Sequence, residues 1–154
     1  MQTKEFLKGT KPRDASKLKV SIVVATFHSD ITDAMMDGAL KTLKAWKVKE
    51  KNVTVRRVYG SFDLPFAAAL AIKKDKPNAV IAIGCIVKGE TKHDEYIAHA
   101  VAQGLTNLSI EHVIPVSLGI LTVNTLAQAK ARSSGKTNHG EKAAVAALQA
   151  ALLR

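Results

Sequence analysis

The fold is decided by residues 79–95, which read Ala-Val-Ile-Ala-Ile-Gly-Cys-Ile-Val and then Lys-Gly-Glu-Thr-Lys-His-Asp-Glu. The first nine residues are apolar without alternation, so both faces of a strand over residues 79–87 have to be covered. A strand of this kind is typical of the centre of a parallel α/β sheet. We expect a helix to follow it, with Ile97, Val101, Leu105 and Leu108 on the buried face.

The turn after this strand has the sequence of a helix start that can hold an anion. Thr91 followed by Asp94 is a variant of the capping box, in which Asp replaces the usual Glu. We therefore expect the backbone amides of residues 89–91 to point outward over the end of the strand. His93 falls in the first turn, where the helix dipole disfavours imidazolium while Asp94 and Glu95 favour it. A histidine in this position can exchange protons near neutral pH.

Length and composition predict one domain over residues 1–154, with a core of Ala, Val, Ile and Leu, because 47% of the residues are hydrophobic and only 5% aromatic. No apolar run approaches the roughly 20 residues that span a membrane. The first residues are polar and charged, unlike a secretory signal, so we expect a soluble cytoplasmic protein. The one cysteine, Cys85, lies in the apolar strand and is predicted to be a packed, inert thiol.

The net charge of +10 raises the question of acidic partners. Lys and Arg are spread along the chain without the interleaved aromatic residues of a base-stacking surface. We interpret them as solvated charge and expect no nucleic-acid partner. The rival is a basic nucleic-acid-binding protein, which would hold duplex DNA at moderate salt.

Three further strands are expected, and each is followed by a loop and a helix. The strands are predicted at residues 18–25, 53–59 and 115–121, and the other helices at 31–46, 66–73, 126–132 and 141–152. Ser29 or Asp30 is expected to cap the helix at 31–46, and Pro65 suits the first turn of the next. The repeated pattern predicts a doubly wound, flavodoxin-like α/β fold, a four-stranded parallel sheet with helices on both faces.

The amino-terminal stretch 1–17 has no clean periodicity, and Gly9 and Pro12 would interrupt a helix or a central strand. We predict an amino-terminal arm there, ordered only where another surface receives it. Two residues stand at the carboxyl ends of strands, where open α/β sheets bind ligands: Phe27 and Asp63. Local packing is the alternative for Phe27, and helix capping for Asp63. His99 and His112 have no spacing that suggests a metal, and no metal is expected.

Five segments carry a family resemblance. They are Ala25-Thr26-Phe27-His28-Ser29-Asp30-Ile31-Thr32-Asp33, Gly60-Ser61-Phe62-Asp63-Leu64-Pro65, Ile83-Gly84-Cys85-Ile86-Val87-Lys88-Gly89-Glu90-Thr91-Lys92-His93, Leu118-Gly119-Ile120-Leu121-Thr122 and Ala129-Lys130-Ala131-Arg132. In content, order and spacing they resemble lumazine synthase, the penultimate enzyme of riboflavin biosynthesis, from about Leu18 to the end of the chain.

The resemblance implies a transferase without cofactor or metal. The enzyme condenses 5-amino-6-(D-ribitylamino)uracil with 3,4-dihydroxy-2-butanone 4-phosphate, and it releases 6,7-dimethyl-8-ribityllumazine, phosphate and water. By the matching positions, Phe27 would stack on the heterocycle. The ribityl chain would be held by Ser61, Phe62 and Asp63, and the uracil edge would meet the backbone near Ile86, Val87 and Lys88.

The same resemblance implies that phosphate is received by Gly89, Glu90 and Thr91 together with Arg132, and that His93 moves protons. Leu118 stands where many members have a phenylalanine over the ring, Lys88 replaces a common arginine, and Asp94 follows the histidine where bacterial members usually have an aromatic residue. His139 matches the family's lysine only approximately, because the loop after Arg132 is shorter.

The resemblance further implies an obligate homopentamer in which Arg132 reaches the site of an adjacent subunit, with a 60-subunit shell as the alternative assembly. We expect the basic arm to lie across that neighbour, and riboflavin synthase to be the functional partner. Two rival functions use the same sheet edge. One is a non-catalytic flavodoxin-like module that binds a flavin or nucleotide, and the other is the archaeal type of riboflavin synthase.

Overall fold

The stretch at residues 79–87 forms β3 (Ala79–Val87), an interior strand of a four-stranded parallel sheet. The computed structural model describes residues 2–154. The strand order is β2-β1-β3-β4, and the other strands are β1 (Val20–Ala25), β2 (Val53–Val58) and β4 (Val116–Val123). Residues 79–86 are all buried, so the prediction of a strand covered on both faces is confirmed.

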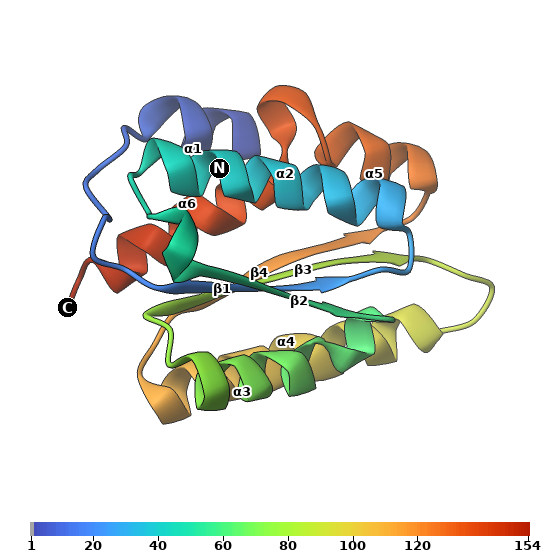
Figure 1. Ribbon diagram of the computed structural model, residues 1–154. Coiled ribbons are helices and arrows are strands. Elements are labelled where there is room, and N and C mark those ends of the chain that lie inside the picture. Colours follow the sequence, from blue (N-terminus) through green and yellow to red (C-terminus); the bar gives the residue numbers. More distant parts are fainter. Residues whose placement is uncertain (1) are drawn as a thin grey trace.

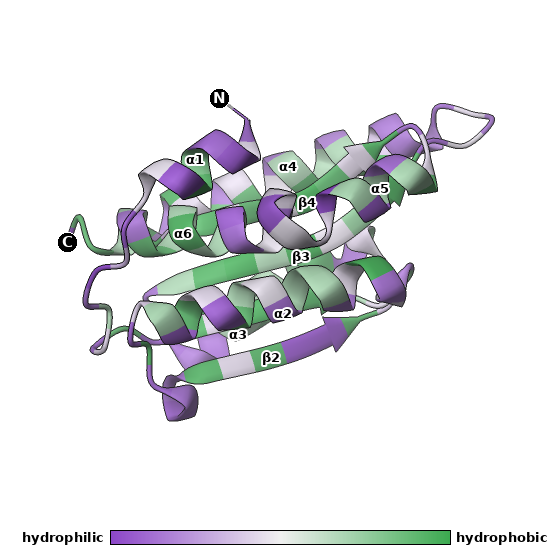
Figure 2. Ribbon diagram, turned by 90° about the horizontal axis from the view of Figure 1, so that it is seen from above, coloured by the Kyte–Doolittle hydropathy of each residue, from purple (hydrophilic) through white to green (hydrophobic). Residues whose placement is uncertain are grey.

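Helices cover both faces of the sheet, as the predicted doubly wound fold requires (Figure 1). One face carries α3 (Leu64–Asp75) and α4 (His93–His112). The other carries α1 (Thr3–Gly9), α2 (Ser29–Ala45), α5 (Leu126–Arg132) and α6 (His139–Ala151). Short 3-10 turns lie at η1 (Glu50–Asn52), η2 (Ser61–Asp63) and η3 (Gly135–Thr137). Figure 2 shows β3 as hydrophobic along its length and the edge strand β2 as mixed.

Two apolar cores follow from this layering. Beneath α2 and α6, side chains of alternate β1 and β3 residues such as Ile22 and Ile81 pack with the buried Trp46 and Leu148. On the opposite face, the intervening strand residues pack with Leu64 and Leu105, among others. The four parallel carboxyl ends therefore meet at one edge of the molecule. Within residues 2–154, none of the helices combines the length and the apolar character needed to cross a membrane.

The strand and helix boundaries differ from the predicted ones by a few residues. The expected strand at 115–121 continues to Val123, because Thr122 and Val123 pair with the last residues of β3. The last helix begins at His139, two residues before the predicted start, because the buried Asn138 caps it.

The amino-terminal stretch departs most from its prediction. It contains the helix α1, and this helix packs on the chain's own α6 (Figure 1). Phe6 and Leu7 lie against the core cluster, and the buried Ala15 donates its amide to the carbonyl of Trp46 at 2.8 Å. Gly9 ends the helix and does not prevent it. Two neighbouring apolar residues are too weak a pattern to predict this docking from sequence.

Asn138 and Gly140 fix α6 against α2. The side-chain amide of Asn138 donates to the carbonyls of Ala34 at 3.1 Å and Ser133 at 3.0 Å. Its Oδ1 accepts from the backbone amide of Gly140 at 2.8 Å. A Cβ built on Gly140 would lie 1.8 Å from the carbonyl oxygen of Met35. The two helices can therefore approach this closely only with glycine at position 140.

We predict that Gly140→Ala lowers the free energy of unfolding by about 2 kcal/mol or more, because the methyl group forces α6 away from α2. The measurement is urea unfolding followed by circular dichroism. Gly9→Ala is the matched control, since a Cβ there meets nothing within 4 Å, and we expect it to stay within about 0.5 kcal/mol of wild type. Equal stability of the two variants would contradict this account of the helix contact.

Candidate active site

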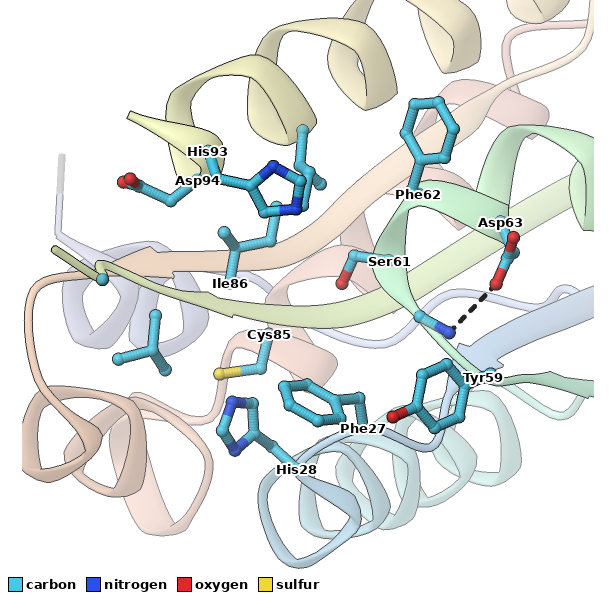
Figure 3. Close-up of a pocket in the computed structure, with 14 residues that line it drawn as sticks. Phe27, His28, Tyr59, Ser61, Phe62, Asp63, Cys85, Ile86, His93 and Asp94 are labelled. Atoms are coloured by element: carbon cyan, nitrogen blue, oxygen red, sulfur yellow. Dashed lines mark hydrogen bonds between the residues drawn. The ribbon is translucent and has the colours of Figure 1, made fainter. Parts of the chain in front are cut away.

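A cavity of about 460 Å³ opens at the carboxyl ends of β1, β2 and β3 (Figure 3). Its walls come from the β1–α2 loop, the β2–α3 turn, the end of β3 and the first turn of α4. Eight of the residues predicted from the sequence line it: Phe27, Ser61, Phe62, Asp63, Ile86, Val87, Gly89 and His93. Segments far apart in the sequence therefore meet at the edge where the parallel strands end.

Phe27 supplies an aromatic face to this cavity. Its backbone amide donates to the carbonyl of Tyr59 at 2.8 Å, which ties the β1–α2 loop to the end of β2. The ring lies 4.5 Å from the His28 ring in an edge contact and 5.7 Å from the Tyr59 ring. It is still 52% exposed. Local packing thus orients the ring without covering it, and a flat ligand can stack there.

Ser61, Phe62 and Asp63 form the η2 turn beside this face. Ser61 is buried against β3, where a Cβ on Gly84 would lie 2.6 Å from its Oγ. The Asp63 carboxylate accepts the backbone amide of Gly60 at 3.1 Å, and it makes no capping hydrogen bond to α3. Asp63 thus takes the N-cap position of α3, but its side chain caps the η2 turn and not α3. The remaining carboxylate oxygen and the Ser61 hydroxyl offer polar groups suited to a polyhydroxylated chain.

His93 is the first residue of α4 and turns its ring toward Ile86 on the cavity wall (Figure 3). The predicted capping box is wrong, because α4 begins one residue later than that motif requires and Lys92 takes the N-cap position without a side-chain bond. Thr91 instead accepts the His93 amide at 3.4 Å. Within residues 2–154, the amides of Gly89, Glu90 and Thr91 donate to no protein group.

The residue at the N-cap of α2 is His28, not the predicted Ser29 or Asp30. His28 has a left-handed backbone, with φ 61° and ψ 50°, and its carbonyl accepts the amides of Ile31 and Thr32 at 3.0 and 3.1 Å. This strained conformation turns the chain sharply after Phe27. His28 also lines the cavity, as do Tyr59, Gly60, Asp94 and Ile97, which the sequence had not singled out as site residues.

Cys85 also lines the cavity, and its side chain lies on the other side of β3 from that of Ile86 (Figure 3). Burial raises the pKa of its thiol to about 11, and the negative charge of Asp30 acts in the same direction. The thiol is therefore protonated at neutral pH, in agreement with the prediction of an inert cysteine. Asp94 also lines the cavity, and one oxygen of its carboxylate is buried without a hydrogen-bond partner in the described part of the chain. Its carboxylate points away from the His93 ring in Figure 3.

The other predicted site residues lie outside this cavity. Glu90 and Thr91 come directly after Gly89, which lines the cavity, but they do not line it themselves. The Lys88 amide donates to the carbonyl of Val123 at 2.8 Å. Leu118 lies on the edge strand β4 and is 57% exposed. Arg132 and His139 line a second cavity, beside α1.

The described residues that line the first cavity include no Lys or Arg. A phosphorylated ligand bound there would therefore find no permanent positive charge on the cavity wall. Among residues 2–154, there is also no cluster of three or more His, Cys, Asp or Glu side chains that could hold a metal ion.

The chain matches the family model described as 6,7-dimethyl-8-ribityllumazine synthase over residues 17–154. Curated proteins of that name are similar to it along most of their length. The protein of Phocaeicola vulgatus is 41% identical over 137 residues, which cover 88% of this chain and 82% of the relative. That of Bacteroides fragilis is 41% identical over 86% of this chain and 93% of the relative. That of Mycobacterium sp. strain KMS is 45% identical over 90% and 86%, respectively.

Proposed function

We propose how this site works from the premise that the chain belongs to the 6,7-dimethyl-8-ribityllumazine synthase family. The chain is therefore an enzyme of riboflavin biosynthesis. It condenses 5-amino-6-(D-ribitylamino)uracil with 3,4-dihydroxy-2-butanone 4-phosphate to form 6,7-dimethyl-8-ribityllumazine. The family match decides against the two rivals, a non-catalytic flavodoxin-like module and the archaeal type of riboflavin synthase. The roles of the individual residues, given below, are proposals.

The pyrimidine and its ribityl chain bind in the first cavity. The half-exposed Phe27 ring stacks on the heterocycle. The ribityl hydroxyls are held at the η2 turn by Ser61, Phe62 and Asp63, and the uracil edge meets the backbone at the end of β3, at Ile86, Val87 and Lys88. The arrangement that supports these roles is a half-exposed ring and a hydroxyl-binding turn on the wall of one cavity.

His93 is the group that moves protons. The reaction joins an amine to a ketone, expels water to give an imine, and then eliminates phosphate after loss of a proton from carbon. Each of these steps needs a group that accepts and returns protons beside the reacting carbon atoms. His93 supports this role because its ring turns into the cavity at the end of β3, beside the turn proposed to receive phosphate.

The phosphate of the second substrate lies over the free amides of Gly89, Glu90 and Thr91. Amides alone match a phosphate dianion poorly, whereas an arginine offers paired charged donors. The proposed assembly is supported by the wall of the first cavity, which has no Lys or Arg among the described residues. Arg132, His139 and Leu118 lie elsewhere on the same chain. Arg132 of an adjacent subunit completes the site.

The minimum active unit is then a homopentamer, with a 60-subunit shell as the larger alternative. A ring suits a site made of two different surfaces, because each subunit gives one half to one neighbour and receives the other half from the next. We further propose a cytoplasmic location and riboflavin synthase as the enzyme that consumes the product.

We predict that His93→Ala lowers turnover by roughly 100-fold or more, while the affinity for the uracil substrate changes little. The measurements are the steady-state rate of lumazine formation and a binding titration with the uracil substrate alone. His99→Ala on the exposed side of the same helix is the control and should keep wild-type turnover. Wild-type turnover in the His93 variant would remove this residue from the mechanism.

A second prediction tests the shared site. Phe27→Ala and Arg132→Ala subunits, each of low activity alone, are mixed in equal amounts, unfolded and refolded together. In a ring of identical interfaces, about a quarter of the sites then combine an intact Phe27 with an intact Arg132. We therefore expect about that fraction of wild-type activity to return.

The control for this experiment is each variant refolded by itself, which should recover nothing. Native mass spectrometry of the mixture establishes that subunits of both kinds share one ring. Mixed rings without any return of activity would mean that each complete site is formed within a single subunit.

A further inference from the structure

The second cavity lies between α1, α5, η3 and α6 and has a volume of about 470 Å³. The helices α1, α5 and α6 lie on the same face of the sheet (Figure 1). The lining residues are Gln2, Thr3, Lys4, Ala131, Arg132, Thr137, His139 and Lys142. All of the permanently charged side chains among them are basic, and they come from three different helices.

Two of these cations have a partner within the chain. The Arg132 guanidinium donates to the carbonyl of Gln128, one turn earlier in α5, at 3.1 Å. The ammonium of Lys142 stands 6.0 Å from the centre of the Phe6 ring, so α1 and α6 are also joined by a cation–π contact. The cavity wall is thus built partly from the amino-terminal helix.

His139 lies between these charges but does not add to them at neutral pH. Burial lowers the pKa of its imidazole, and the positive charges of Lys142 and Arg132 lower it further. The carbonyl of Thr137, 3.3 Å from Nδ1, acts in the opposite direction but does not outweigh them. The neutral ring lies 3.4 Å from the Thr3 hydroxyl, which links α6 to α1.

No carboxylate lines the cavity among the residues the structure describes. The side-chain ion pairs formed within residues 2–154 join Arg56 to Asp75 and Arg57 to Asp33, and all four residues lie away from it. Glu5, near the start of α1, has its carboxylate turned to the amide of Gln2. Three like charges around one cavity repel one another, and a bound dianion would reverse that cost.

We infer that Lys4 and Lys142 join Arg132 in binding the phosphate group of the four-carbon substrate, and that α1 is therefore one wall of this half of the active site. The inference rests on the proposed function, in which Arg132 serves the first cavity of an adjacent subunit. A phosphate group offers several acceptor oxygens and about two negative charges, which three cationic side chains can match. The same three cations then hold free phosphate after its elimination.

The test compares Lys142→Met and Lys4→Met with the wild-type assembled enzyme. Methionine keeps an unbranched apolar side chain of similar length while removing the charge. We expect the KM for the phosphorylated substrate to rise about 10-fold or more in each variant, as for loss of a charged hydrogen bond. The KM for the uracil substrate should stay within about twofold of wild type, because the lost charge interacts only with the phosphorylated substrate.

Two further variants sharpen the comparison. Lys8→Met is the matched control, since Lys8 is exposed on the same helix α1 and does not line the cavity; its KM values should equal those of wild type. Lys142→Arg keeps the charge and should restore most of the affinity for the phosphorylated substrate.

Free phosphate gives a second readout that needs no catalysis. A titration with inorganic phosphate, followed by phosphorus NMR, should show weaker binding to Lys142→Met and Lys4→Met than to wild type. If inorganic phosphate binding is unchanged while the KM for the substrate rises, the cations act on the ester alone and the proposed holding of the free product is wrong.

Two outcomes overturn the inference. One is an unchanged KM for the phosphorylated substrate in both methionine variants. The other is a parallel change of both KM values and kcat with a lowered melting temperature, which would assign the lysines to folding. The proposed function fails separately, through a wild-type enzyme that forms no 6,7-dimethyl-8-ribityllumazine from the two substrates.

Discussion

A strand buried on both faces is the constraint on which the rest of this structure depends. β3 can be covered on both sides only if helices return across the sheet after each strand, and this makes all four strands parallel. Parallel strands end at one edge, and this edge carries Phe27, the η2 turn and the first turn of α4. The packing requirement of nine apolar residues thus fixes where the first cavity lies, while most of the polar groups that line it come from the loops.

The described wall of the first cavity carries no Lys or Arg side chain. An aromatic ring, hydroxyl-binding groups and a histidine meet in the first cavity, whereas the arginine lies with two lysines in a second one. A substrate that carries phosphate needs both sets of groups at once. In the proposed function, self-association is therefore a condition of catalysis, because Arg132 of an adjacent subunit brings the second set of groups to the first cavity.

Much of the fold could be predicted from the sequence, because its elements have strong local patterns. The continuous apolar run predicted β3 correctly, and the helix predicted at residues 126–132 is α5. The structure of α1 could not be predicted, since its stability comes from the contact of Phe6 and Leu7 with a core assembled by distant segments. The start of α4 was misplaced by one residue, because the turn after β3 follows its pairing with β4 as well as its own capping residues. His28 was not predicted as the N-cap of α2, because no local pattern marks its left-handed backbone. The environment of His139 could not be predicted either, because it depends on Thr3, 136 residues away in the sequence.

In the proposed function, one chain holds two halves of different sites, and only an assembly is active. The most direct test measures specific activity and mass, by native mass spectrometry, on the same samples over a dilution series that takes the assembly apart. We expect activity to fall in proportion to the fraction of assembled subunits. The isolated subunit should have no turnover, although circular dichroism should show that it keeps its fold. A folded monomer with the specific activity of the assembly would contradict it.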